Sequence, residues 1–187
     1  VIVKRFFAGC LSALLAIMIA SLSATAQTAQ VSQIGILDVR LLLTKSAAAK
    51  DIRLQSKRIM NEYQQDVSRR ESVLRKDQLG LLEQRSVLSD EAFDKRRRQF
   101  EIRARKEQQE VRTRKLAIER AHRSAENQIK TAFLRIAMGV AIEKKINIVM
   151  AKSAVLLSLK NLEITAETMK RLNKQLPKVA VEVAKKK

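Results

Sequence analysis

The chain has 187 residues, with only one Pro and four Gly, and a formal net charge of +19. This scarcity of turn-forming residues excludes a collagen-like chain and a Pro/Gly low-complexity chain, and it argues against a turn-rich β-sandwich. A charged fraction of 30% beside 46% apolar and only 3% aromatic residues predicts long helices with thin apolar stripes rather than one large core. The excess of positive charge predicts an anionic partner or surface.

The N-terminus has the three parts of a secretory signal peptide. Lys4 and Arg5 precede an uncharged apolar run, and residues 24–26 (Ala-Thr-Ala) then supply small residues at both recognition positions of a cleavage site. The alternative is a membrane anchor, but a membrane span needs about 20 apolar residues and this run is shorter. We therefore predict a signal peptide over residues 1–26, cleaved after Ala26, and a mature protein outside the cytoplasm.

Cleavage would remove Cys10 with two basic residues, which leaves a net charge of +17 and no cysteine. The mature protein would then have no disulfide, no thiolate nucleophile and no thiolate metal site. His122 is the only histidine, and Gly35, Gly80 and Gly139 are isolated, so the sequence has no imidazole metal cluster and no Gly-rich phosphate loop. We expect a protein that is not an enzyme and that uses no cofactor and no metal.

After the signal peptide, an apolar run over residues 33–38 predicts a buried strand, and residues 39–43 predict a brief helical turn. A long helix is then expected from Ser46, its N-cap, to Leu88. Apolar residues recur along it at separations of seven or four, which is the spacing of one helical face. These residues are Ile52, Ile59, Tyr63, Val67, Leu74, Leu81 and Leu88. Arg70, Asp77 and Gln84 interrupt the stripe, which is interpreted as a packing face and not as a ligand site.

A second helix is expected to begin after Ser89 and to continue to about Lys144. Ser89 is a suitable N-cap, and Leu88 with Phe93 occupy the two positions of a hydrophobic staple. The apolar line of this helix consists of Phe93, Phe100, Ala104, Val111, Ile118, Ala125, Ala132, Ile136 and Val140. Glu107 and Arg114 interrupt it. Because only a short turn separates the two helices, we predict that they form an antiparallel hairpin.

The C-terminal part changes to a β-rich pattern. Residues 146–151 and 154–159 predict two strands joined as a tight hairpin. A final helix is expected with Thr165 as its N-cap and an end near Gln175, before the only proline of the chain. We expect residues 178–187 to form a mobile basic tail.

Together these elements predict an α+β fold: a small β body, residues 27–45 and 145–187, carries a long antiparallel helical hairpin arm, residues 46–144. The body is small for a stable core of its own, and a three-stranded sheet leaves open edges, so we expect it to associate. The apolar residues predicted for this oligomerisation body are Ile34, Ile36, Leu37, Ile146, Ile148, Val149, Val155 and Leu157.

The second helix carries the main charge signal. Between Lys95 and Arg123 there are twelve basic and four acidic residues, a local charge of +8. We expect this stretch to attract net-acidic unfolded chains or anionic lipid headgroups, while nearby apolar side chains make weak contacts. The candidate binding residues are Arg96, Arg97, Arg98, Arg103, Arg105, Lys106, Arg112, Arg114, Lys115, Arg120, Arg123, Phe93, Phe100 and Val111. A solvated helix face with internal pairs, such as Glu101 with Arg105, stays open as the alternative for each residue.

Several short segments flank the long charged helices in a characteristic order. They are the signal peptide, residues 34–38 (Ile-Gly-Ile-Leu-Asp), 146–149 (Ile-Asn-Ile-Val), 151–156 (Ala-Lys-Ser-Ala-Val-Leu), 164–165 (Ile-Thr) and 170–173 (Lys-Arg-Leu-Asn). In this order the chain resembles the OmpH/Skp-like periplasmic chaperones of Gram-negative bacteria over nearly the whole mature sequence. It departs from them at residues 47–50 (Ala-Ala-Ala-Lys), where relatives often have a Gly before a Lys.

The resemblance implies a homotrimer in which the strands form a central β-barrel-like body and three helical hairpins project as tentacles around a cavity. It implies an ATP-independent periplasmic holdase that binds unfolded outer-membrane proteins, prevents their aggregation and helps deliver them to the outer membrane. Anionic lipid or lipopolysaccharide is a further partner that the resemblance suggests, without a residue assigned to it.

Two other function classes compete with this one. A nucleic-acid-binding coiled coil would explain the charge, but the signal peptide and the lack of aromatics arranged to stack bases argue against it, so no nucleic-acid partner is expected. An envelope coiled-coil structural or adaptor protein without chaperone activity would explain the helices, although it predicts continuous apolar heptads. The second alternative stays open.

Overall fold

A computed structural model describes residues 32–184, and the predicted signal peptide and the last three lysines lie outside the described residues. The contacts below all belong to the unit that begins at Gln33. The described chain is mostly helical, with long helices and a small sheet. Its elements are β1 (Ile34–Leu37), α2 (Val39–Lys45), α3 (Ala47–Glu83), the 3-10 turn η1 (Gln84–Ser86), α4 (Asp90–Glu143), β2 (Ile148–Ala151), the 3-10 turns η2 (Lys152–Ala154) and η3 (Lys160–Leu162), and α5 (Thr165–Gln175).

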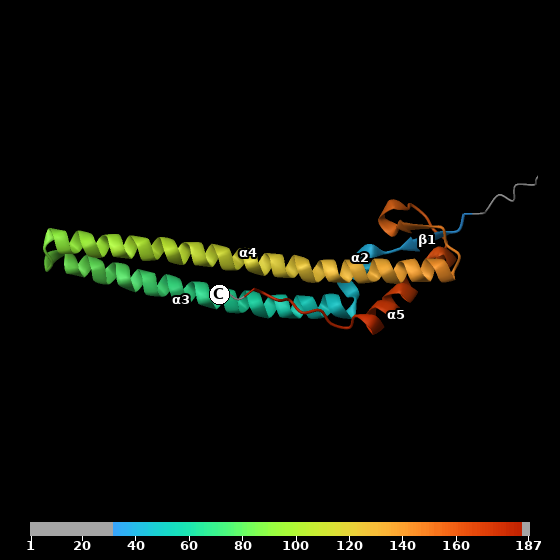
Figure 1. The fold of residues 1–187 in the computed structure, drawn as a ribbon, viewed down its shortest axis with the longest axis horizontal. Coiled ribbons are helices and arrows are strands. Elements are labelled where there is room, and N and C mark those ends of the chain that lie inside the picture. Colours follow the sequence, from blue (N-terminus) through green and yellow to red (C-terminus); the bar gives the residue numbers. More distant parts are fainter. Residues whose placement is uncertain (1–31, 185–187) are drawn as a thin grey trace, which may run out of the picture. The chain divides into compact units, whose positions relative to one another are not determined.

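Helices α3 and α4 lie side by side as an antiparallel hairpin (Figure 1). At 1.5 Å per residue, their 37 and 54 residues give lengths of about 55 Å and about 80 Å. Both predicted N-caps are confirmed: the hydroxyl of Ser46 accepts from the N–H of Ala49, and that of Ser89 accepts from the N–H of Ala92. Helix α3 ends at Glu83, earlier than expected, because η1 begins the turn.

Strands β1 and β2 pair in parallel, with Ile34 opposite Ile148 and Leu37 opposite Ala151. The predicted hairpin of residues 146–151 with 154–159 is therefore wrong. Residues 154–159 form no strand, because β2 finds its partner in the distant β1 and the connection after it turns at once into η2. A single bridge from Ile36 to Glu163 extends the pairing on the other side of β1.

Helix α4 ends in a Schellman motif. Lys145 has a positive φ of 56°, the N–H of Ile146 bonds to the C=O of Ala141, and the N–H of Lys145 bonds to the C=O of Ile142. This turn brings Ile146 against Gly35 of β1, where an added Cβ would come within 3.1 Å of the Ile146 side chain. A larger residue at position 35 would therefore require the Ile146 side chain to shift by a few tenths of an ångström.

The main core lies where the hairpin meets the strands and α5. Its buried residues are Leu37, Leu42, Ala48, Ala49, Ile52, Ala121, Ala125, Ile129, Phe133, Ile136, Ala137, Val140, Ile164, Leu172, Val179 and Val181. Helix α5 is tied to α4 by Arg171, which forms ion pairs of 2.6 Å with Glu143 and with Glu167 of its own helix. It is tied to the start of α3 by Asn173, whose Oδ1 accepts from the N–H of Ala47 at 2.8 Å.

Two further expectations for the C-terminal part are wrong. Thr165 is not an N-cap: it is the first residue of α5, and its hydroxyl accepts from the N–H of Asp38 at 2.9 Å, so a contact with the N-terminal part replaces the local one. Residues 178–184 are not a mobile tail, because Val179 and Val181 are buried in the core. The expected end of the last helix at Gln175 is confirmed.

Leu172→Ala is expected to lower the free energy of unfolding by about 2–5 kcal/mol, because the side chain is fully buried and its removal leaves a cavity. Leu54→Ala is the matched control, since Leu54 is 69% exposed, and its effect should be within about 0.5 kcal/mol. Urea unfolding at one fixed protein concentration measures both. Equal effects would contradict the position of the core.

Candidate functional site

The polar residues that interrupt the apolar stripe of α3 are paired across the hairpin. Arg70 contacts Glu107 and Glu110 of α4, and Asp77 Oδ2 lies 2.6 Å from Arg103 Nη2. Gln84 accepts a hydrogen bond from Arg96 nearer the tip. Along this part of the arm, polar contacts thus replace the continuous apolar packing of a permanent coiled coil.

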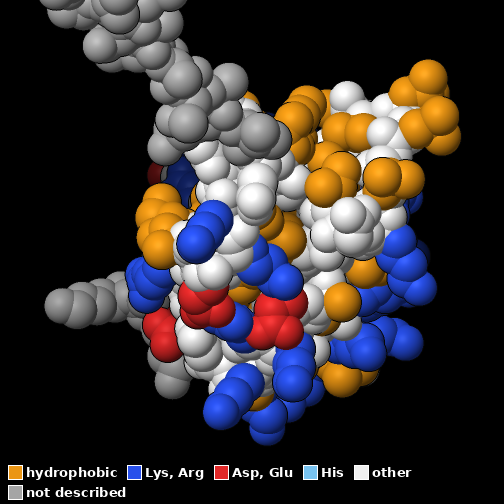
Figure 2. Space-filling model, turned by 90° about the vertical axis from the view of Figure 1, so that its right-hand side faces the viewer, with side chains coloured by type: hydrophobic (Ala, Val, Ile, Leu, Met, Phe, Trp, Pro, Cys, Tyr) orange, Lys and Arg blue, Asp and Glu red, His pale blue; other side chains and the backbone are white. Residues whose placement is uncertain are grey.

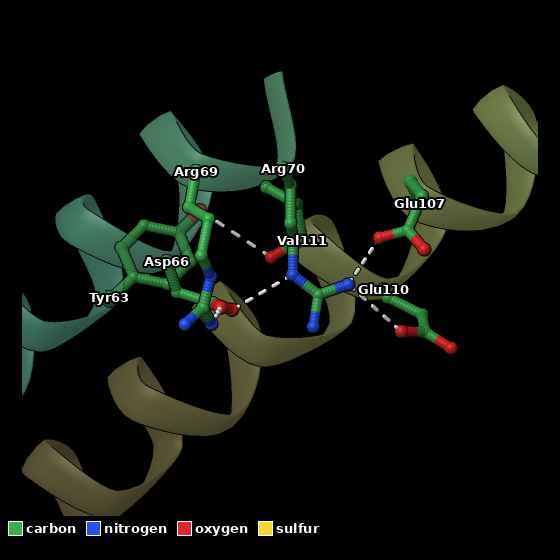
Figure 3. Close-up of polar contacts among 7 residues, drawn as sticks. All are labelled: Tyr63, Asp66, Arg69, Arg70, Glu107, Glu110 and Val111. Atoms are coloured by element: carbon green, nitrogen blue, oxygen red, sulfur yellow. Dashed lines mark hydrogen bonds and ion pairs between the residues drawn. The ribbon is translucent and has the colours of Figure 1, made fainter. Parts of the chain in front are cut away.

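Arg70 is the centre of the largest of these networks (Figure 3). Its Nε donates to Asp66 Oδ2 at 2.9 Å, and its Nη1 reaches both glutamates of α4. Desolvation raises the pKa of the Asp66 carboxyl, but hydrogen bonds and attraction from Arg69 and Arg70 outweigh it, so that the pKa lies below its ordinary value. The network is therefore charged at neutral pH, and it lies where α3 faces α4.

The tip of the arm is closed by an aromatic contact. Phe93, in the first turn of α4, is buried, and the guanidinium of Arg85 lies 4.5 Å from the centre of its ring. A cation over an aromatic face is attracted by the ring quadrupole. Phe93 thus helps to hold the turn between the helices.

All eleven basic candidates on α4 are exposed. Four of them have partners: Arg96 with Gln84, Arg97 with Asp94 and Glu101, Arg98 with the C=O of Asp94, and Arg103 with Asp77. For the other seven, the described part of the chain shows no salt bridge. They are Arg105, Lys106, Arg112, Arg114, Lys115, Arg120 and Arg123. Glu101 pairs with Arg97 and not with Arg105, so the basic face keeps most of its charge available.

The three apolar candidates lie differently from the basic ones. Phe93 is buried, and Phe100 and Val111 are half-buried, with the C=O of Val111 accepting from the Tyr63 hydroxyl of α3 at 3.4 Å. The strongly exposed apolar side chains of the arm are others: Leu54, Val73, Leu79, Leu82, Val87, Ile102, Leu116, Leu134, Met138 and Ile142. None of them belongs to the apolar lines from which the candidate residues were predicted. The sequence signal that could have found them is the presence of apolar residues outside those lines.

The residues predicted for the oligomerisation body divide into two groups. Ile36 and Leu37 are buried within the chain itself, and Ile146 packs on Gly35. Ile34, Ile148 and Val149 are exposed on the sheet, while Val155 and Leu157 lie in irregular chain after β2, where Leu156, Leu157 and Leu159 are strongly exposed. Figure 2 shows hydrophobic side chains gathered on a projecting part of this end of the molecule.

Within residues 32–184 no helix is both long enough and apolar enough to cross a membrane. The same residues contain no group of His, Cys, Asp and Glu side chains placed to bind a metal ion.

A known fold combines such an arm with such a small sheet. The chain has the OmpH-like fold: it is similar to a crystal structure described as an OmpH-like outer membrane chaperone, with a TM-score of 0.73 over 80% of this chain and 88% of that one. That protein comes from Caulobacter crescentus CB15 and shares 14% of its residues with this chain. The resemblance seen in the sequence is thus confirmed at the level of the fold. No family model and no curated protein sequence matches the chain.

Arg70→Leu is expected to lower the free energy of unfolding by about 1–3 kcal/mol at pH 7, because it leaves the carboxylates of Asp66, Glu107 and Glu110 without their common cation. Arg69→Leu, at a side chain that is 76% exposed, removes the same charge and should change stability little.

The same comparison has a pH dependence. The pKa of Asp66 is lower in the folded chain than its ordinary value of 3.8. The ionised carboxylate therefore contributes to the free energy of unfolding above pH 3.8, and this contribution is lost as the pH falls through the folded-state pKa. The difference in the free energy of unfolding between R70L and the native chain should therefore become smaller at acid pH. Urea unfolding at pH 7 and at about pH 3 measures it, and a gap that stays constant would contradict the assigned role of the network.

Proposed function

We propose that the mature chain is a periplasmic holdase that binds unfolded outer-membrane proteins, prevents their aggregation and helps deliver them to the outer membrane. The observation that carries this proposal is the surface of the arm, where exposed apolar side chains such as Val87 and Ile102 lie among exposed basic ones. Net-acidic unfolded chains are attracted by the charge, and their apolar residues find many weak contacts in place of one pocket. The OmpH-like fold supports the same function.

The mechanism uses binding without a chemical step. Exposed Arg and Lys side chains hold their charge at every physiological pH, and their long stems add apolar contact area. No single contact is strong, so a client can rearrange on the arm and leave it without ATP. The same cations would also contact anionic lipid headgroups, which makes the membrane surface a second partner of the arm.

The proposal includes a homotrimer formed through the strand end of the molecule. Strand β2 pairs only with β1 among the described elements, so one of its edges is open. Ile148 and Val149 on that strand and Leu156 and Leu157 after it are exposed, more apolar surface than an isolated small sheet usually leaves in water. Burial of this surface between copies would place three arms around a shared space.

The polar contacts between the helices favour a holdase over the envelope scaffold. A scaffold gains rigidity from continuous apolar heptads, whereas here Arg70, Asp77 and Gln84 face polar partners at successive heptad positions. Such contacts weaken as salt or a competing charge screens them. The arm can then adapt its shape to different clients.

Aggregation of an unfolded outer-membrane β-barrel protein, followed by light scattering, tests the holdase directly. We expect suppression at stoichiometric trimer and a loss of client affinity as salt is raised, because exposed charges are screened within about 10 Å at 0.1 M. No suppression would overturn the proposal.

The variant R105Q/K106Q/R112Q should weaken client binding about tenfold at low salt, since three exposed charges are lost. The matched control K57Q/R58Q/R75Q removes the same charge from exposed positions of α3 and should have a smaller effect. Equal effects would show that only net charge matters.

Sedimentation velocity tests the trimer. The native mature chain is expected as a trimer at micromolar concentration, and I148E/V149E is expected to dissociate it, because two charges would be buried between copies. Leu54→Glu on the arm is the control and should leave the trimer intact. A native chain that sediments as a monomer would overturn this part of the proposal.

A further inference from the structure

The chain after α5 lies in an extended conformation against α3 (Figure 1). Its exposure alternates with a period of two: Val179 and Val181 are only 4% and 7% exposed and Val183 is half-buried, whereas Ala180, Glu182 and Ala184 are exposed. This is the pattern of a strand with one buried face, although its neighbour is a helix.

Gln55 of α3 holds the backbone of this segment. Its Nε2 donates to the C=O of Val179 at 2.9 Å, and its Oε1 accepts from the N–H of Val181 at 2.9 Å. In a strand these two groups point to the same side, so one side-chain amide satisfies the pair that an adjacent strand would satisfy. Asp51 Oδ2 accepts from Gln55 Nε2 at 2.7 Å and fixes the orientation of the amide.

The side chains of the segment enter the core of the hairpin. Val179 and Val181 belong to the same buried cluster as Ile52 of α3 and Ala121 and Ala125 of α4. The α4 members named here are small, and they are 7% and 0% exposed. Backbone contacts combined with pockets for alternate side chains are the usual way in which proteins bind an extended strand.

None of these contacts requires that the strand be the chain's own. Toward the segment, Gln55 bonds only to backbone atoms, and the segment's buried side chains are apolar residues at alternate positions. Strands of membrane β-barrels alternate in the same way, with apolar residues on the lipid-facing side.

We propose that this groove, defined by Asp51, Gln55, Ile52, Ala121 and Ala125, is a binding site for extended client strands with alternating apolar residues, and that residues 178–184 occupy it as an internal competitor. The inference rests on the proposed holdase function. A client strand displaces the C-terminal segment from the groove. The larger the fraction of time that the segment occupies the groove, the lower is the apparent affinity of the groove for a client strand.

Hydrogen exchange on the full mature chain tests the displacement. The probe is the peptide Lys-Val-Ala-Val-Glu-Val-Ala, which has the sequence of residues 178–184. At saturation it should raise the exchange rate of the Val181 amide about tenfold, because that N–H loses its bond to Gln55. The peptide Val-Val-Val-Lys-Ala-Glu-Ala, of equal composition without alternation, should have no effect. Unchanged protection of the Val181 amide in the presence of the first peptide would overturn the proposal. Protection of this amide that falls when the protein is diluted would also overturn it, because the segment in the groove would then come from a second copy of the chain.

Two full-length variants give an independent measurement by fluorescence anisotropy of the labelled first peptide. V179D/V181D should release the segment and bind the peptide about fivefold more tightly than the native chain. A180D/A184D adds the same charge at exposed positions and should bind like the native chain. Equal affinity of all three would overturn the proposal. Gln55→Ala, which leaves the apolar core in place, should both release Val181 and abolish peptide binding, and retained binding would overturn it as well.

The failure of this inference can be distinguished from failure of the holdase. If the native chain suppresses aggregation of a β-barrel client while residues 178–184 stay protected, the groove is a structural contact only and the holdase stands. If aggregation is not suppressed, the proposed function fails whatever the peptide does.

Discussion

The parallel pairing of β1 with β2 is the constraint on which the rest of the molecule depends. Parallel strands cannot be joined by a tight turn, so the whole of α2, α3 and α4 forms the crossover between them. Both ends of the long hairpin are therefore fixed at one place. The contact of Ile146 with Gly35 and the Schellman turn at Lys145 set the direction in which the chain returns to the sheet.

The arm combines two kinds of packing. Near the sheet, small and aliphatic residues of α4 from Ile118 onward are buried, and α5 and the C-terminal segment cover them. Beyond that point Phe93 is the one buried side chain of α4, and polar pairs such as Arg70 with Glu107 replace the apolar seam. Local opening should thus require less free energy toward the tip. The arrangement joins a stable base to a surface that can adapt.

Local signals in the sequence predicted the helices well. Ser46 and Ser89 have the hydroxyl acceptors that helix N-termini need, and the only proline sets the end of α5. Long-range choices were not predictable from such signals. A β-rich run gives no indication that its partner lies before the hairpin, and the hydroxyl of Thr165 serves Asp38 in place of its own helix. The exposed basic face was recognised from the sequence, but the C-terminal segment was not, because Gln55 and Val181 become neighbours only after folding.

The heptad spacing of Arg70, Asp77 and Gln84 also limits how the arm can change in length. Each meets a partner on α4, and these partners follow one another in the reverse direction along the chain. An insertion into one helix alone would shift its residues relative to those of the other helix. The polar residues past the insertion would then no longer meet their present partners. The hairpin can therefore be lengthened or shortened only by equal changes in both helices, so that the polar pairs act as marks of helix register in the way that a buried polar residue does in a coiled coil.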